Sequence, residues 1–219
     1  MGQIKNTNNY SIIYLEGFEM ITIATAECFT HGILAREIHA LAQDYEDNFG
    51  CKYSNLVNEV QKDCLKDAIL EDKCSIFDLR DLSVTCGLFI PTLDAVRSIL
   101  QIDNPVEPLE LIKGIKVYDD VGDIEMSILM AEAAKKLAGT SIGIGTTAGI
   151  GNGGIAIVDD DMIISTSSDV NANLIKANSN NLYMRQKSGI EKTLRILIYY
   201  LNDNFDRIRN LNNVNIIYK

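Results

Sequence analysis

The sequence is short of basic residues and of long hydrophobic runs, and each shortage excludes a class of protein. Twenty Lys and Arg residues stand against thirty Asp and Glu residues, a formal net charge of −10 in 219 residues. This charge would repel nucleic-acid phosphates and anionic lipid headgroups, and no local basic patch offsets it. No apolar run approaches the roughly 20 residues that span a bilayer, and residues 1–19 lack the features of a secretory signal. We therefore expect a cytoplasmic protein without nucleic-acid or membrane partners.

Cysteine and histidine are also too sparse for a disulfide framework or an obvious metal site. The five cysteines are odd in number and contain no CxxC pair, and the chain is long enough to fold without disulfides. We expect reduced thiols. With only two histidines, zinc has weak support, and Cys51, Cys64 and Cys74 remain conceivable ligands only if the chain folds them together. We expect no metal and no tightly bound cofactor.

The pattern of elements predicts one α/β domain. Residues 1–19 are Asn-rich and are interpreted as an N-terminal extension, and residues 20–219 as a single domain with an insertion near 44–82. Apolar, β-branched runs predict buried strands, and apolar residues at helical spacing predict helices. Strands are expected at 20–25, 82–90, 111–118, 141–145 and as a pair around the acidic turn 159–161. Helices are expected after Cys28, within 44–82, after a Thr92 cap, over 123–138 and over about 181–202, before a helical or frayed tail.

Alternation of strands and helices favours three α/β/α layers around a mixed, mostly parallel sheet. The clearest helix, 123–138, is Ala-rich, begins with acidic residues, ends with basic ones and is closed by Gly139. No internal repeat interrupts this order.

Six glycines fall within residues 143–154 and allow the backbone to approach a ligand closely. The segment GIGTTA superficially matches a dinucleotide-binding fingerprint, but that motif requires a helix next, whereas an apolar strand follows here. A P-loop is excluded because GK[ST] is absent. Two interpretations stay open: a tight strand-to-strand turn without ligand, or a site floor of exposed amides.

Cys28 follows the first strand and is the strongest candidate nucleophile. The carboxyl ends of strands are where open α/β sheets bind ligands. A helix beginning at this position would lower the thiol pKa from about 8.5, because free N–H groups favour the thiolate. Glu27 and the acidic composition argue against a thiolate, and most intracellular cysteines are small buried hydrophobes.

Several polar residues could assist Cys28 or bind a ligand. His31 would share a helical face with Cys28, and Thr30 could donate a hydroxyl or cap the first turn. Ser168 and Asp169 follow a strand, and they could cap a turn or bind a ribose or base. The candidate site is therefore catalytic Cys28, His31 and Thr30 with ligand-binding residues Glu27, Thr146, Thr147, Gly149, Gly151, Asn152, Gly153, Ser168 and Asp169.

Three segments carry a family resemblance. ATAECFTHG (24–32) resembles the ATAESCTGG signature of the CinA C-terminal fold, the nicotinamide mononucleotide deamidases, and TTAGIGNGG (146–154) resembles their glycine loop. The sequence is still more similar to the HcgF-type proteins of iron-guanylylpyridinol (FeGP) cofactor biosynthesis in methanogenic archaea. That resemblance extends over ATAECFTHG, GLFIPTLDAVRSIL and GIGTTAGIGNGGI, within residues 20–175.

The resemblance implies a function. Guanylylpyridinol would bind between the glycine loop and the first helix, and Cys28 would take its carboxymethyl group as a thioester. An adenylating, ubiquitin-activating-like partner would first activate that carboxylate. Cys28 stands where the deamidases have a serine, and the lysine that activates this serine falls near Val96; a thiol can act without such a base. The family fold also implies a homo-oligomer.

Two other functions remain open. One is hydrolysis of an amide on a nicotinamide-type nucleotide, with Cys28 in place of serine; the missing lysine argues against it. The other is a nucleotide-binding module without chemistry, in which Cys28 is only a contact. A stable adduct on Cys28, released ammonia, or binding without an adduct would distinguish the three.

Overall fold

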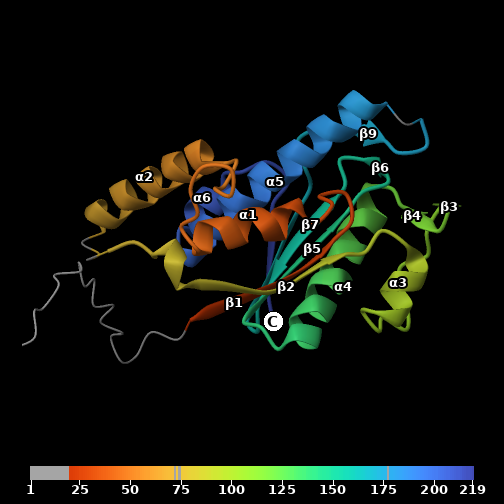
Figure 1. The fold of residues 1–219 in the computed structure, drawn as a ribbon, viewed down its shortest axis with the longest axis horizontal. Helices are drawn as coiled ribbons and strands as arrows, with labels where there is room; N and C mark the ends of the chain where they lie inside the picture. The colour runs from red at the N-terminus through yellow and green to blue at the C-terminus, as the bar shows by residue number, and fades with distance from the viewer. Residues whose placement is uncertain (1–19, 72, 74, 177) are drawn as a thin grey trace, which may run out of the picture.

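The protein is built around one six-stranded sheet with helices on both faces (Figure 1). The structure, a computed structural model, describes residues 20–71, 73, 75–176 and 178–219. The predicted N-terminal extension lies outside these residues. In spatial order the strands of the sheet are β10 (Asn215–Tyr218), β8 (Met162–Thr166), β7 (Gly154–Val158), β5 (Ile142–Thr147), β1 (Ile21–Glu27) and β2 (Leu82–Phe89).

The sheet is parallel at one end and antiparallel at the other. Strand β1 lies parallel to both β2 and β5, because helical segments connect these three strands. The pairs β5–β7, β7–β8 and β8–β10 are antiparallel, and β7 joins β8 through the tight acidic turn 159–161. The predicted α/β class with a mixed sheet is confirmed, with its parallel character concentrated around β1.

Helices complete the three layers. On one face lie α1 (Ile33–Ala42), α2 (Ser54–Leu70), α5 (Ser179–Leu201) and α6 (Phe205–Arg209); on the other lie α4 (Asp120–Ala138) and the short α3 (Leu93–Ser98). Small additions are the 3₁₀ turn η1 (Leu79–Asp81) and the strand pairs β3 (Glu110–Ile112) with β4 (Ile115–Val117) and β6 (Ile150–Gly151) with β9 (Ala172–Asn173). Two predicted helix ends are confirmed: Thr92 caps α3, and Gly139 ends α4 in a left-handed conformation.

Two glycines of β5 let α4 lie directly on the sheet. A Cβ atom on Gly143 would lie 2.0 Å from the carbonyl oxygen of Ala131, and one on Gly145 would lie 1.9 Å from that of Ser127. Only glycine permits this contact between helix and strand backbones. These two members of the glycine-rich segment therefore serve packing.

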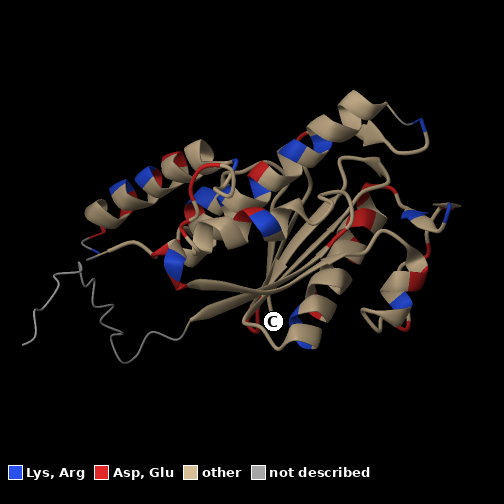
Figure 2. Ribbon diagram, viewed as in Figure 1, with Lys and Arg blue, Asp and Glu red and all other residues tan. Residues whose placement is uncertain are grey.

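The segment expected as an insertion near 44–82 contains the helix expected there, and the C-terminal tail differs from its expectation. Helix α2 buries Val57, Val60 and Cys64 in the same core as residues of α1 and α5. The tail expected to be helical contains the short α6 and then β10, which pairs with β8 as the edge strand of the sheet. Both segments bury apolar side chains, although many charged residues make their sequences look exposed. Figure 2 shows Lys and Arg interleaved with Asp and Glu along α2.

Candidate functional site

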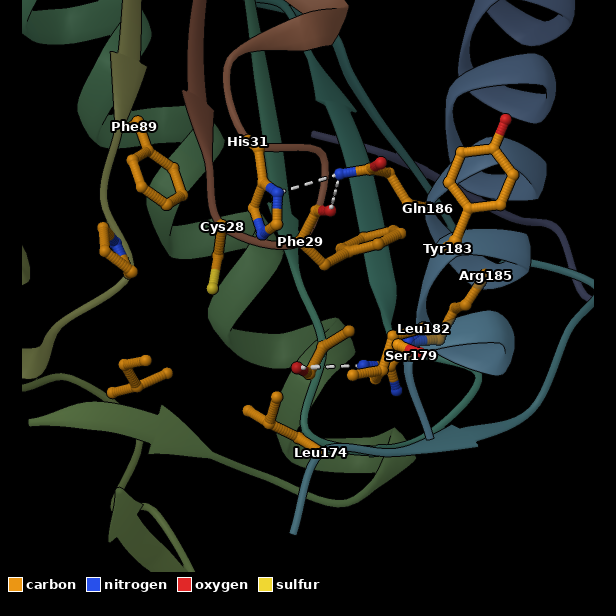
Figure 3. A pocket seen from close by; sticks show the side chains of 13 residues that line it. Cys28, Phe29, His31, Phe89, Leu174, Ser179, Leu182, Tyr183, Arg185 and Gln186 are labelled. Carbon is orange, nitrogen blue, oxygen red and sulfur yellow. Dashed lines mark hydrogen bonds between the residues drawn. The ribbon is translucent and has the colours of Figure 1, made fainter. Parts of the chain in front are cut away.

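A cavity of about 350 Å³ opens where β1 and β2 end (Figure 3). It brings together the turn after β1, the end of β2, the turn after β5 and the first half of α5. This is the edge at which open α/β sheets commonly bind ligands. Most of its walls are apolar or aromatic, and its lining residues are Cys28, Phe29, His31, Phe89, Pro91, Ile115, Ala148, Leu174, Ser179, Leu182, Tyr183, Arg185 and Gln186.

Cys28 lies at the wall of this cavity. Its backbone N–H donates to the carbonyl oxygen of Thr146 at 2.8 Å, which fixes the turn against β5. The side chain is 6% exposed, and its sulfur points into the open space between Phe89 and Leu174 (Figure 3). As the sequence predicted, Cys28 stands on the turn between the first core strand and the following helix. A small ligand in the cavity would meet this sulfur.

The first helix does not begin at Cys28, and its N-terminus serves Glu27 instead. Helix α1 starts at Ile33. The carboxylate of Glu27 accepts hydrogen bonds from the backbone N–H groups of Leu34 at 3.1 Å and Ala35 at 2.8 Å, and from the Thr25 hydroxyl at 2.9 Å. Glu27 is fully buried and does not line the cavity. The expected effect of the helix N-terminus on Cys28 was therefore wrong, because a buried carboxylate occupies it.

His31 belongs to the cavity wall, but through a turn rather than a helix. Its backbone has φ 56°, so it does not share a helical face with Cys28 as expected. Its Nδ1 lies 3.0 Å from the Gln186 side-chain nitrogen, which also donates to the carbonyl oxygen of Phe29 at 3.0 Å. The ring meets Phe89 edge-on, with centroids 5.3 Å apart. Gln186 thus links α5 to the Cys28 turn, a role that no local sequence signal indicated.

The threonines expected in the site lie behind it. Thr30 and Thr146 are fully buried, and their hydroxyl oxygens are 2.8 Å apart, so they join the Cys28 turn to β5. Thr147 is also fully buried, and its hydroxyl has no hydrogen-bond partner within the described part of the chain. None of the three lines the cavity.

The glycine turn after β5 directs its backbone groups into the protein. The N–H of Gly149 donates to Asp123 at 2.8 Å, and the N–H of Asn152 donates to Asp120 at 2.6 Å. The Arg185 guanidinium of α5 donates to the carbonyl oxygens of Ala148, Gly149, Gly151 and Ala172 at 3.0–3.4 Å. Gly149, Gly151, Asn152 and Gly153, the expected floor of ligand-binding amides, do not line the cavity; of this turn only Ala148 does.

Ser168 and Asp169 lie on the far side of that turn. The Ser168 hydroxyl donates to the carbonyl oxygen of Asn152 at 2.7 Å, and the Asn152 amide donates back to the carbonyl oxygen of Ser168 at 3.0 Å. Asp169 forms an ion pair with the buried Lys192 at 2.8 Å. Neither residue reaches the cavity, so the turn-stabilising interpretation of this segment agrees with the structure.

Two buried titratable groups contact the glycine turn: Arg185, which lines the cavity, and Asp123, which does not. Burial raises the pKa of Asp123 to about 7, although the Gly149 hydrogen bond and the charge of Arg185 oppose the rise. Burial likewise lowers the pKa of Arg185, which is 2% exposed, and the charges of Asp123 and Cys28 oppose that change. Sequence reasoning missed both groups, because they meet only when α4 and α5 pack around the glycine turn.

The described residues form neither a metal-ligand cluster nor a membrane-spanning helix. Within the described residues, no three His, Cys, Asp or Glu side chains gather as ligands for a metal ion. Cys74, which the sequence offered with Cys51 and Cys64 as a conceivable zinc ligand, lies outside the described residues. In the same part of the chain, no helix has the length and apolar character needed to cross a bilayer.

Comparisons with known proteins identify the family of this chain. Residues 20–201 match the family model described as FeGP cofactor biosynthesis protein HcgF. The chain is 42% identical over 188 residues to a UPF0254 protein of Methanothermobacter thermautotrophicus (strain Winter), which covers 86% of this chain and 100% of that relative. It is 38% identical over 182 residues to a UPF0254 protein of Methanocorpusculum labreanum, covering 83% and 92%.

A UPF0254 protein of Methanopyrus kandleri is 37% identical over 190 residues, covering 86% of this chain and 92% of that relative. The family match includes the whole segment from β1 to α5, and so every residue that lines the cavity. The chain therefore belongs to the HcgF family of FeGP cofactor biosynthesis proteins.

Proposed function

We propose that this protein binds guanylylpyridinol and holds its activated carboxymethyl group as a thioester on Cys28. Membership of the HcgF family implies a role in FeGP cofactor biosynthesis. The observation that supports the more specific step is the Cys28 sulfur directed into an aromatic-lined cavity. A thiol is a competent nucleophile, and the sulfur lies on the cavity side of its turn rather than within the core.

The cavity chemistry suits one end of such a ligand. Its volume lies near the lower end of the range for small-molecule sites, so it would take the pyridinol ring while the nucleotide extends through the opening. Phe89 and Tyr183 are about half exposed at the walls and offer faces for a flat heteroaromatic ring. The ring's carboxymethyl group would then approach Cys28.

The reaction requires an activated carboxylate, because a free carboxylate is a poor acyl donor. An adenylating enzyme of the ubiquitin-activating type would supply the acyl adenylate. The Cys28 sulfur would attack the acyl carbon and form a C–S bond, while the C–O bond to AMP breaks and AMP leaves with its electron pair. The thiol proton would pass to solvent. Apolar walls limit water around the product, which favours persistence of the thioester over hydrolysis.

Intact-protein mass spectrometry tests this proposal. We expect wild-type protein, incubated with guanylylpyridinol, ATP and the adenylating enzyme, to gain the mass of the ligand minus water, and hydroxylamine to remove it. Cys28→Ala should gain nothing. The matched control is Cys86→Ser, a half-buried cysteine of β2 that does not line the cavity, which should gain the full adduct.

The same experiment separates the other two functions. Release of ammonia from a nicotinamide-type nucleotide, lost in Cys28→Ala, would favour amide hydrolysis. Ligand binding without any adduct in the wild type would favour a binding module. Either result would contradict the thioester proposal.

A further inference from the structure

Lys116 is the unusual residue next to this site. It belongs to β4 and its side chain is fully buried. Its Nζ donates to the carbonyl oxygens of Ile90 at 2.7 Å and Pro91 at 3.3 Å. Lysine is almost never fully buried without a partner, yet no carboxylate of the described residues lies within ion-pair distance of this ammonium. An ammonium has three hydrogens, and two carbonyl oxygens account for two of them.

The backbone connects Lys116 closely to Cys28. Ile90, which accepts from Lys116, donates its own N–H to the carbonyl oxygen of Glu27 at 2.7 Å. Glu27 directly precedes Cys28, so a single residue, Ile90, links the ammonium to the strand end that carries the thiol. Pro91, the second acceptor of Lys116, and Ile115, which precedes it in β4, line the same cavity as Cys28. Lys116 therefore lies just behind the cavity wall.

The charges around Lys116 leave Cys28 as its available counter-ion. Burial lowers the pKa of Lys116, and the charges of Cys28 and Asp123 oppose this change. Asp123 has other partners, because the charge of Arg185 acts on its carboxyl group and it accepts a hydrogen bond from the Gly149 N–H. A buried ammonium becomes favourable once an anion forms nearby.

The other ionisable groups around Cys28 have separate partners. Arg185 of α5 donates to the glycine turn, and the Tyr118 hydroxyl, after β4, donates to the carbonyl oxygen of Val106. Glu27 of β1 uses both carboxylate oxygens at the start of α1, and His31 is held by Gln186 on the solvent side. Arg185 thus donates to four carbonyl oxygens, although its Nε has no partner within the described residues, whereas Lys116 donates to only two.

We infer that Lys116 is a positioning residue for Cys28, whose buried ammonium stabilises the thiolate from behind the cavity wall. The sequence resemblance indicated that the activating lysine of related enzymes is lost near Val96; Val96 is fully buried in α3, and Lys116 supplies a cation from a different element. The thiol proton leaves to solvent through the cavity, and Lys116 keeps its own proton. The inference rests on the proposed function for the identity of the nucleophile.

The pH dependence of alkylation tests this role in the full chain without ligand or adenylating enzyme. We expect Lys116→Met to move the midpoint of Cys28 alkylation by iodoacetamide upward by about one pH unit, and to slow alkylation at pH 7 about tenfold. The matched control is Lys192→Met, which removes a buried lysine that pairs with Asp169 and does not line the cavity. It should leave the midpoint unchanged. An unchanged midpoint in folded Lys116→Met would overturn the inference.

A measurement on the unsubstituted protein covers the case in which Lys116→Met fails to fold. Carbamidomethylation of Cys28 removes the anion, and the coupling between two sites is reciprocal. The titration midpoint of Lys116, followed by the NMR signal of its ¹³Cε, should then fall by about one pH unit. A midpoint that does not move contradicts the inference. Alkylation needs no acyl adenylate. The absence of a thioester would therefore contradict the proposed function but not the role of Lys116.

Discussion

Two turns leave neighbouring strands at the same edge of the sheet, and they use their backbones in opposite ways. The turn after β1 presents Cys28, Phe29 and His31 to the cavity. The turn after β5 is rich in glycine, but its N–H and C=O groups bind Asp123, Asp120 and Arg185 of the protein itself. The glycines serve close packing, and the side chains of the other turn face the cavity.

The difference shows that glycine density alone does not indicate a ligand site. A Cβ atom on Gly149 would lie 2.4 Å from backbone atoms of Tyr118, and one on Gly151 would lie 2.2 Å from the Asp120 carboxylate. Glycine is required there because neighbouring chain segments fill the space a side chain would take. The hydrogen bond between Thr30 and Thr146 then couples the two turns.

Replacing Arg185 should have the largest effect on the glycine turn. We expect Arg185→Met to lower the free energy of unfolding by about 3–5 kcal/mol, because it leaves three carbonyl oxygens of the glycine turn, that of Ala172 and the Asp123 carboxylate without their cation. Urea unfolding followed by circular dichroism measures this loss. Arg80→Met, at an exposed ion pair, should change stability by less than about 0.5 kcal/mol. Equal effects of the two variants would contradict the assigned role of Arg185.

Gly149→Ala tests whether the glycine turn serves packing. The added methyl group would meet the Tyr118 backbone, and we expect a loss of about 3 kcal/mol in the same unfolding measurement. Gly139→Ala is the control, since open space surrounds that left-handed cap and only about 1 kcal/mol of backbone strain is expected. Unchanged stability with selective loss of ligand binding would restore the ligand-floor interpretation.

Asp123 should make stability depend on pH. Its pKa is raised from 3.8 to about 7 in the folded protein, so between these values the folded state binds more protons than the unfolded state. Stability contributed by the protonated form is therefore lost as pH rises through about 4 to 7. We expect the free energy of unfolding to fall by about 2 kcal/mol from pH 5 to pH 8, relative to Asp123→Asn. Parallel pH profiles for the two proteins would show that Asp123 is not perturbed.

Thr30→Val removes the hydrogen bond between the turn after β1 and Thr146 of β5. It removes a buried hydroxyl and leaves that of Thr146 with only a long contact to the Cys28 N–H, so we expect a loss of about 1 kcal/mol. Thr30→Ser keeps the hydroxyl and should retain most of the stability. If Val and Ser lose the same amount, the methyl group rather than the hydrogen bond matters at this position.

His31→Asn should produce the smallest change in stability. The side chain is exposed, and asparagine tolerates the left-handed backbone at this position, so we expect a change within about 0.5 kcal/mol. Isothermal titration with guanylylpyridinol should nevertheless show weaker binding, because the ring is part of the cavity wall. Unaltered affinity would remove His31 from the site.

Local patterns predicted much of the fold but fewer of the residues around the cavity. The buried run of β1, the Thr92 cap and the Gly139 terminus were read from neighbouring residues, because each depends on local backbone preferences. Gln186, Arg185 and Phe89 were missed, since they reach the cavity from elements distant in sequence. The edge strand β10 was also missed, because its pairing with β8 replaces a weak local helical tendency.

By itself, the sequence determined the α/β class, the family and the position of Cys28 at the end of a buried strand. These features follow from hydrophobic periodicity, turn residues and short motifs, which act over a few residues. Only the tertiary structure decided that Glu27 caps α1, that the glycine turn faces inward and that Lys116 lies behind the thiol. Those outcomes depend on which distant groups are buried together. A buried charge or backbone polar group without a partner is costly, so each such group pairs with whatever the fold brings next to it.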